Sequence, residues 1–144
     1  MTDAVIRPMI RKDRAAASLG LHVVSDEPGR AVVSMRVRGD MLNGFAITHG
    51  GFVFALADTA FAMACNEDER VTVAAGADIT FLKSTVEGQT LTATAVRRAV
   101  SGRNGLYDVT VTDETGDVVA EFRGRSLTTN RVFDAQGDAE DADG

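Results

Sequence analysis

The chain has 144 residues, which predicts one domain with one substantial core. Hydrophobic residues make up 44% and charged residues 25% of it, as in ordinary globular proteins. The formal net charge is −6, and residues 134–144 hold five acids and no base, so the rest of the chain is nearly neutral. An acidic chain without a basic patch excludes non-specific nucleic-acid binding.

One cysteine excludes an intrachain disulfide, and together with two histidines it offers too few ligands for a zinc cluster. The N-terminus carries no apolar signal segment. The longest apolar run, residues 50–65, has a central acid and is shorter than the ~20 residues of a membrane span. We therefore expect a cytoplasmic protein without a membrane partner.

The predicted elements begin with a short helix at residues 8–19, because Pro8 suits a first helical turn and Gly20 a helix end. A strand is expected at residues 21–25. Residues 30–38 alternate between apolar and polar side chains, which predicts a strand with one buried face. The apolar members of that alternation are Ala31, Val33, Met35 and Val37.

The segment at about residues 50–66 is apolar all round and too long for a strand, which predicts a buried helix. Four strands should follow it in a meander of hairpins, because glycine and acidic or amide residues mark the turns. They are expected at about 72–82, 90–99, 105–112 and 118–129. Residues 1–131 thus form one predicted domain, and the acidic residues 132–144 are expected to be a disordered tail.

This order of elements predicts an α+β fold, in which a curved six-stranded antiparallel sheet wraps around one long buried helix. Such a sheet leaves open edges, which a dimer can pair.

Asp58 is the only ionisable residue between His49 and Glu67. A charge inside an apolar helix is costly to bury without partners, and the same side of the helix offers no strong donor. The partner must therefore come from another segment or another subunit. Burial should raise the pKa of the carboxyl and make it a better base. The alternative is a structural acid held by backbone or hydroxyl donors.

His49, Gly50 and Gly51 open the predicted helix, where backbone N–H groups lack intrahelical partners and can bind an oxyanion. Asn43 and His49 could orient a carbonyl or a water. The alternatives are a glycine hinge, a capping role for His49 and an Asx-turn at Asn43.

Three longer stretches carry a family resemblance: Met41-Leu42-Asn43-Gly44, His49-Gly50-Gly51 and Leu56-Ala57-Asp58-Thr59-Ala60-Phe61. Together with residues 78–83, 102–109 and 120–126, they resemble the signature of hotdog-fold acyl-CoA thioesterases. The phenylacetate-pathway (PaaI-type) enzymes are the nearest kind. The likeness spans roughly residues 19–127.

The resemblance implies that Asp58 activates water or attacks the thioester itself. It implies that the Gly51 N–H binds the oxyanion and that Asn43 and His49 position the carbonyl or the water. It also implies a homodimer with shared sites, assembling to a homotetramer, in which Asp58 of one subunit faces Asn43, His49 and Gly51 of the other. Residues 73–77 offer no hydroxyl to hold a water, so base and nucleophile both stay open for Asp58.

Coenzyme A would be part of the substrate, and no cofactor is expected. Its phosphates need cations and backbone N–H groups. The candidates are Lys83, Arg98, Arg103 and Arg125, with the turn at Ser101 and Gly102. The acyl group would lie against Phe54, Phe61 and Phe81, which could equally be core.

The leading prediction is hydrolysis of an acyl-CoA thioester, with phenylacetyl or a hydroxylated aryl-acetyl group as the acyl part. The alternatives are a non-catalytic acyl-CoA-binding module and a hotdog hydratase or dehydratase.

Overall fold

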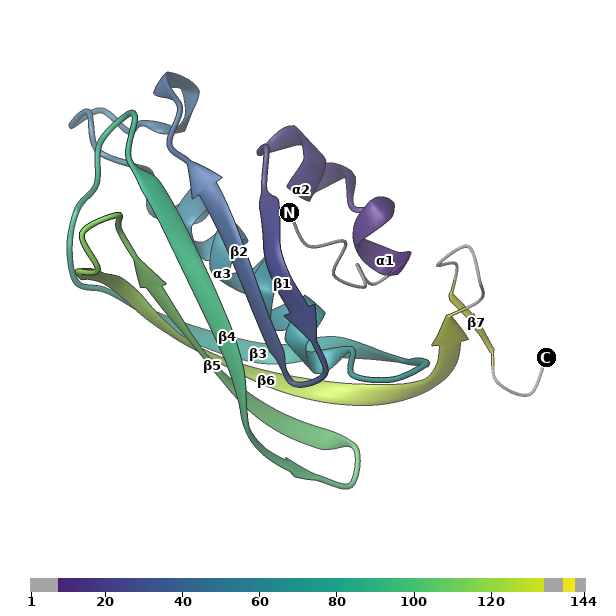
Figure 1. Ribbon diagram of the computed structural model, residues 1–144. Coiled ribbons are helices and arrows are strands. Elements are labelled where there is room, and N and C mark those ends of the chain that lie inside the picture. Colours follow the sequence, from purple (N-terminus) through teal and green to yellow (C-terminus); the bar gives the residue numbers. More distant parts are fainter. Residues whose placement is uncertain (1–7, 134–138, 142–144) are drawn as a thin grey trace.

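In the computed structural model, which describes residues 8–133 and 139–141, an antiparallel sheet curves around one long helix (Figure 1). The strands follow the order β1-β2-β4-β5-β6-β3, and the short β7 pairs with β6. Their bounds are β1 His22–Glu27, β2 Arg30–Arg36, β3 Arg70–Phe81, β4 Thr90–Ser101, β5 Asn104–Thr112, β6 Val118–Phe133 and β7 Ala139–Asp141. The helices are α1 Pro8–Arg11, α2 Arg14–Ser18, the short 3-10 turn η1 Gly39–Met41, and α3 Gly50–Cys65. The predicted α+β hotdog architecture is confirmed.

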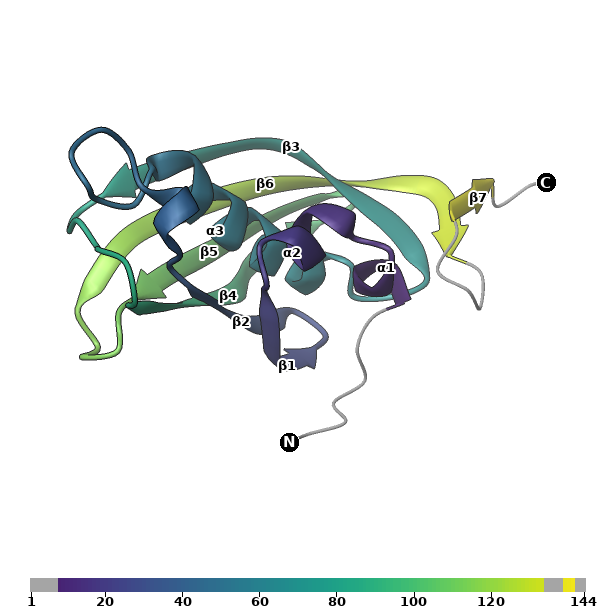
Figure 2. The same cartoon turned by 90° about the horizontal axis from the view of Figure 1, so that it is seen from above.

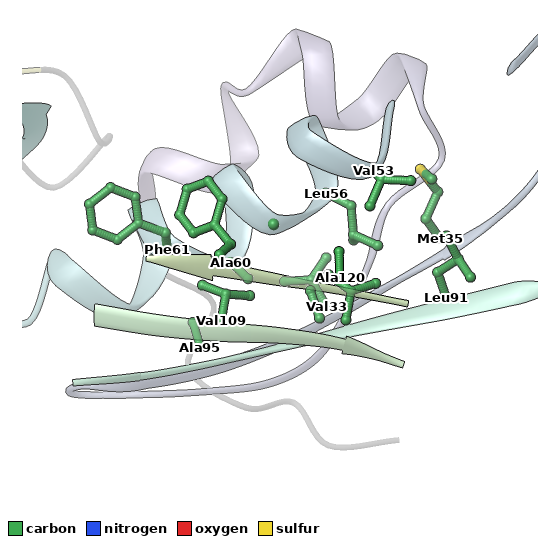
Figure 3. Packing of buried hydrophobic residues seen from close by; sticks show 14 of the residues in the cluster. Val33, Met35, Val53, Leu56, Ala60, Phe61, Leu91, Ala95, Val109 and Ala120 are labelled. Carbon is green, nitrogen blue, oxygen red and sulfur yellow. The ribbon is translucent and has the colours of Figure 1, made fainter. Parts of the chain in front are cut away.

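The core lies between α3 and the concave face of the sheet. Figure 3 shows Leu56 and Ala60 of α3 pointing toward side chains of the sheet, including Val33 and Val109. The predicted buried face is confirmed, since Ala31, Val33, Met35 and Val37 are at most 1% exposed, and Val32 on the other face is also buried at 9% exposure. Apolar side chains from β2 and α3 thus pack together in one continuous core.

The N-terminal helix differs from its prediction, because it is broken into α1 and α2 (Figure 2). Asp13 interrupts it: its backbone is extended, and its side chain accepts a hydrogen bond from the Ala16 N–H. An aspartate competes with the helix by bonding nearby backbone groups, so it favours starting a new helix over continuing the old one.

The predicted meander is wrong at its first connection. β3 pairs with β6 rather than β4, and β4 pairs with β2. Residues 82–89 therefore cross from one edge of the sheet toward its middle and pass the start of α3, where the Thr48 N–H donates to the Thr85 carbonyl at 2.8 Å. Turn residues alone could not distinguish this crossover from a hairpin, because strand partners are set by packing on α3.

The tail prediction is corrected where the structure describes the tail. Val132 and Phe133 belong to β6, and Ala139–Asp141 forms β7, which pairs with residues 131–133. The composition of this segment lacks apolar anchors, but backbone pairing at a strand end does not need them. Residues 134–138 and 142–144 lie outside the described residues. None of the helices in the described ranges is long and apolar enough to cross a membrane.

Candidate active site along helix α3

Asp58 lies in the middle of α3 and is half-buried. Within the described part of the chain, no group donates a hydrogen bond to its carboxylate. Burial raises the pKa of this carboxyl, and the negative charge of Asp13 raises it further. A carboxylate that is hard to ionise and free of donors is a stronger base than an exposed one.

The start of α3 is capped by His49, whose Nδ1 accepts a hydrogen bond from the Gly51 N–H at 3.2 Å. The capping alternative for His49 therefore describes what the structure shows. Because Nδ1 accepts, the neutral imidazole carries its proton on Nε2, which can donate to a substrate from an exposed side chain. The hydrogen bond from the Gly51 N–H to His49 is long, so an oxyanion, which is a stronger acceptor, can take the place of His49 Nδ1.

Asn43 organises the loop before the helix. Its Oδ1 accepts from the Phe45 N–H at 2.9 Å and the Ile47 N–H at 3.4 Å, which is the Asx-type role given as its alternative. Ala46 in this loop has a φ of 60°, a conformation that is costly for alanine and is held by the surrounding bonds. With Oδ1 engaged, the Nδ2 group of Asn43 is the part left to donate to a substrate.

A cavity of about 340 Å³ joins this loop, the start of α3 and the end of β3. Asn43, Gly50 and Phe81 are among its lining residues. A Cβ at Gly50 would lie 3.0 Å from Cζ of Phe81, so the glycine lets the ring rest directly on the helix start. Phe81 is 52% exposed, so its ring forms an open wall of the cavity.

Within a single chain, the predicted catalytic groups lie far apart. Asp58 lies seven residues after Gly51 on the same helix, which corresponds to about 10 Å along the axis at 1.5 Å per residue. The side chain of Asp58 leans toward the N-terminus and shortens this gap only in part. A reacting carbonyl needs its oxyanion donor and its base within about 3 Å each, or through one water. The two groups of one α3 are too far apart for that.

The predicted coenzyme A residues gather mostly at the other end of the molecule. Gly102 and Arg103 line a cavity of about 320 Å³ that reaches Cys65 at the end of α3. Ser101 and Arg125 line an adjoining cavity of about 370 Å³. The structure thus brings these four together and places them away from Asn43 and His49.

The cations differ in how firmly the protein holds them. Lys83 is clamped by the carboxylates of Asp113 at 2.6 Å and Asp117 at 2.7 Å, which raises the pKa of Lys83. These pairs tie the segment after β3 to the β5–β6 turn, and Lys83 also lines the cavity at Asn43 and Gly50, so its phosphate contact stays a prediction. Arg98 pairs with Asp108 at 3.2 Å on the outer face of the sheet and lines neither cavity.

Arg103 donates to Asn130 at 2.8 Å, and Arg125 pairs with Asp78 at 2.9 Å. Both side chains line a cavity; the partner of Arg103 is neutral, and the partner of Arg125 is an exposed acid. They are the cations that the structure leaves best able to turn toward a phosphate.

Of the three aromatic residues predicted for the acyl group, Phe61 is 1% exposed and belongs to the core, where it contacts Phe122 and Tyr107. A Cβ at Gly124 would lie 2.7 Å from its ring, so the sheet is built to fit it. The alternative given for Phe61, a place in the core, describes this packing. Phe54 is half-buried against Phe122, with ring centroids 5.3 Å apart.

Sequence reasoning missed two features near the site. The first is the network at the end of α3, where Glu67 accepts hydrogen bonds from Tyr107 and from Arg97. Burial and the charge of Glu67 raise the pKa of Tyr107. The second is Asp13, whose capping motif is visible in the sequence but whose charge effect on Asp58 is not, because it depends on how α2 packs on α3.

Comparisons with known proteins give one consistent result. A model of the thioesterase superfamily matches residues 45–120. The acyl-coenzyme A thioesterase PaaI of Escherichia coli (strain K12) is 44% identical over 118 residues, which cover 82% of this chain and 84% of that protein.

Solved structures agree with it. The E. coli PaaI protein from the phenylacetic acid degradation operon superposes with a TM-score of 0.82 at 43% identity, covering 84% of this chain and 88% of that one. A mutant of the phenylacetic acid degradation protein PaaI from Thermus thermophilus gives 0.77 at 37% identity, covering 81% and 100%. A Streptococcus mutans protein bound to acetyl CoA gives 0.73 at 28% identity, covering 76% and 88%.

Proposed function

The chain belongs to the thioesterase superfamily, and we propose that it hydrolyses aryl-acetyl-CoA thioesters at a site shared by two subunits. It is an acyl-CoA thioesterase: water adds to the thioester carbonyl, the C–S bond breaks, and the products are the free acid and coenzyme A. The observation that carries the proposed site is the half-buried carboxylate of Asp58, which has no hydrogen-bond donor within the described part of the chain.

Asp58 acts in one of two ways. As a general base, it takes a proton from the attacking water and returns it to the leaving thiolate. As a nucleophile, it forms a mixed anhydride with the acyl group and expels the thiolate, and water then hydrolyses the anhydride. Burial favours both routes, because it strips the carboxylate of the solvation that would lower its reactivity.

The carbonyl oxygen is polarised by three donors at the start of α3. They are the Gly51 N–H, the Nε2–H of His49 and the Nδ2–H of Asn43. The first stands at the positive end of the helix dipole, where negative charge is stabilised. The negative charge that develops on the oxygen strengthens these hydrogen bonds in the transition state relative to the bound thioester.

These donors and Asp58 meet across a dimer in our proposal. Among the described residues β3 is an edge strand, with one side bonded to β6 and no strand paired on the other side. If two β3 strands pair antiparallel about a two-fold axis, the end of one, at Phe81, lies opposite the start of its partner, at Arg70. The cavity at Gly50 and Phe81 would then adjoin the partner's cavity, which Arg70 and Thr72 line together with Arg103.

The same pairing explains where coenzyme A would bind. Arg103 and Arg125 would hold its phosphates at the cavity mouths, with Ser101 and Gly102 beside them. Removing a phosphate contact should raise the KM for an acyl-CoA and leave unchanged the KM for the same acyl group on N-acetylcysteamine, which has no phosphates. We expect this split for Arg103→Ala. An equal rise for both thioesters would contradict the phosphate role.

The acyl part is proposed to be phenylacetyl or a hydroxylated aryl-acetyl group. Phe81, which lines the cavity at the start of α3, suits a ring, and the names of two similar solved proteins refer to phenylacetic acid degradation. Assembly to a homotetramer and a place in phenylacetate catabolism are also part of the proposal and rest on the sequence resemblance. A cytoplasmic location is proposed as well, since a single cysteine fits a reducing compartment.

Mixing two inactive variants tests the shared site most directly. Asp58→Asn and Asn43→Asp homodimers are each expected to release little thiol from phenylacetyl-CoA. If the site is shared, unfolding, mixing and refolding them together yields heterodimers with one intact site, and activity returns. If each subunit holds a complete site, the mixture stays inactive. A panel of acyl-CoAs with a thiol-trapping dye then ranks the acyl groups.

A further inference from the structure

Two buried threonines join the loop before α3 to the segment that connects β3 with β4. This segment, residues 82–89, runs past the loop at one end of the molecule (Figures 1 and 2). The Thr85 carbonyl accepts the Thr48 N–H at 2.8 Å and the Thr48 hydroxyl at 3.2 Å, and the two hydroxyl oxygens lie 2.7 Å apart. Thr48 is 8% and Thr85 2% exposed, so these hydrogen bonds are shielded from water.

Each donor of this pair has an acceptor. When the Thr48 hydroxyl donates to the Thr85 carbonyl, the Thr85 hydroxyl donates to Thr48 Oγ1. The carbonyl oxygen has two lone pairs, one for each of the two donors of Thr48. A buried hydroxyl that is left without its partner is costly, so the pair resists separation.

Thr48 lies between the proposed donors to the substrate carbonyl. The N–H groups of Asn43 and His49 both donate to carbonyls on the opposite limb of the loop at 2.8 Å, which fixes these two residues relative to each other. Apart from bonds within the loop, to η1 and to α3, every hydrogen bond that residues 42–49 make with the described part of the chain goes to Thr85. Thr85 is thus the hydrogen-bonded link between the donors and the sheet.

The connection that carries Thr85 is itself bonded to the sheet on both sides. On one side, the Leu82 N–H donates to the Val119 carbonyl of β6 at 2.8 Å. On the other, the Gly88 N–H donates at 2.9 Å to the carbonyl of Val37, directly after β2. Thr85 therefore presents its oxygens from a segment that is held at both ends, and the loop rests on a fixed support.

We propose that Thr85 is a positioning residue of the hydrolytic site, which holds the donors of the loop in place through Thr48. The inference rests on the proposed function, because it takes Asn43 and His49 as donors to the carbonyl oxygen. Donors that are fixed before the reaction need no reorganisation when negative charge develops on that oxygen. The left-handed backbone of Ala46, at a φ of 60°, stores strain in the loop, which relaxes once an anchor is lost.

Thr85→Val tests the role of the hydroxyl, because valine keeps the branched shape and the backbone carbonyl. We expect kcat for phenylacetyl-CoA to fall about 3- to 30-fold with KM nearly unchanged, since misplacing a catalytic group by about 1 Å costs up to about 100-fold. Thr85→Ser keeps the hydroxyl and should stay within about twofold of the wild-type kcat. Thr48→Val cuts the same pair from the other side. It should lower kcat at least as far, and it replaces Thr85→Val if that variant folds poorly.

The matched control is Thr129→Val. It removes a threonine hydroxyl that donates to the Val71 carbonyl at 2.7 Å, near the start of β3. The connection with Thr85 follows the other end of this strand. The control also loses a hydrogen bond, so its stability should fall, but its kcat should equal that of wild type.

Hydrogen exchange of the Asn43 and His49 amides gives a readout that does not need substrate. Both amides should exchange faster in Thr85→Val, while those of β4 and β5 stay protected as in wild type. The inference is overturned by wild-type kcat or unchanged exchange in Thr85→Val, by a loss confined to KM, or by an equal loss of kcat in Thr129→Val. Should Asp58→Asn retain wild-type turnover, the proposed function itself would fail, so the two failures are distinguishable.

Discussion

At its N-terminal end, α3 begins in an exposed loop whose polar groups are only partly engaged, whereas buried side chains tie down its C-terminal end. His49 and Asn43 each accept a backbone hydrogen bond with one side-chain atom, and each keeps a second nitrogen that could donate to a substrate. At the other end, Asn66 is 2% exposed and bonds Ala62 and both backbone groups of Thr72. The N-terminal end keeps donors for the proposed chemistry, whereas at the C-terminal end a buried amide stabilises the fold beside the cavity that Arg103 lines.

Asp58 stands between the two ends, and its replacement is expected to have the largest effect. Asp58→Asn should lower kcat for thioester hydrolysis by about 100- to 10,000-fold, since an amide is neither a base nor a nucleophile. In the wild type, activity should rise with pH through the raised pKa of this carboxyl. A release assay with a thiol-trapping dye, repeated from acid to neutral pH, measures both effects.

The same variant separates catalysis from folding. The pKa of Asp58 is above its ordinary value of 3.8 in the folded protein, so the folded state binds this proton more tightly than the unfolded state. That contribution is fully present below the unfolded pKa and is lost as pH rises through the folded pKa. Asp58→Asn should therefore be at least as stable as wild type at pH 7, with the difference disappearing in acid. A destabilised variant at pH 7 would mean that Asp58 holds the fold instead.

Asn43→Asp tests whether the loop at the N-terminal end of α3 supplies a hydrogen-bond donor to the substrate. The carboxylate keeps the acceptor for the Phe45 and Ile47 N–H groups but loses the Nδ2 donor. We expect kcat to fall about 100-fold, the usual cost of one oxyanion donor, with little change in melting temperature. Asn43→Ala, which loses the acceptor as well, should also melt earlier. Wild-type kcat in Asn43→Asp would assign this residue to the loop alone.

Asn66→Ala tests whether the C-terminal end of α3 stabilises the fold. It removes an amide that satisfies both backbone groups of buried Thr72, while the Ala62 carbonyl keeps the backbone N–H of residue 66 as a donor at 3.3 Å. Leaving the Thr72 groups without this amide should lower the free energy of unfolding by about 2–3 kcal/mol, measured by urea denaturation. The kcat of the folded fraction should stay within about threefold of wild type. A selective loss of kcat would show that this end takes part in the reaction.

The sequence identified Asp58 and the two ends of α3, but it did not show which residues from distant segments pack beside them. Asp58 stood out because one acid in an apolar helix violates a local rule, and the ends of α3 followed from glycine and periodicity. The pairing of β3 with β6, the clamp on Lys83 and the burial of Phe61 could not be predicted, because each depends on segments far apart in the chain. Lys83 and Phe61 show the limit well: a cation or an aromatic ring near a motif fits a binding role until its partners are known.

The smallest expected effect comes from Gly50→Ala, which probes the contact between the helix start and Phe81. The added methyl would lie 3.0 Å from Cζ of Phe81, a side chain that is half exposed and can shift. The ring should therefore move into the cavity, and the KM for an aryl-acetyl-CoA should rise about two- to fivefold while alanine slightly stabilises the helix. Gly44→Ala is the matched control, because a Cβ there meets nothing within 4 Å. Since both changes add one methyl near the same loop, equal effects on KM would mean that loop flexibility, rather than the position of Phe81, shapes the N-terminal end of α3.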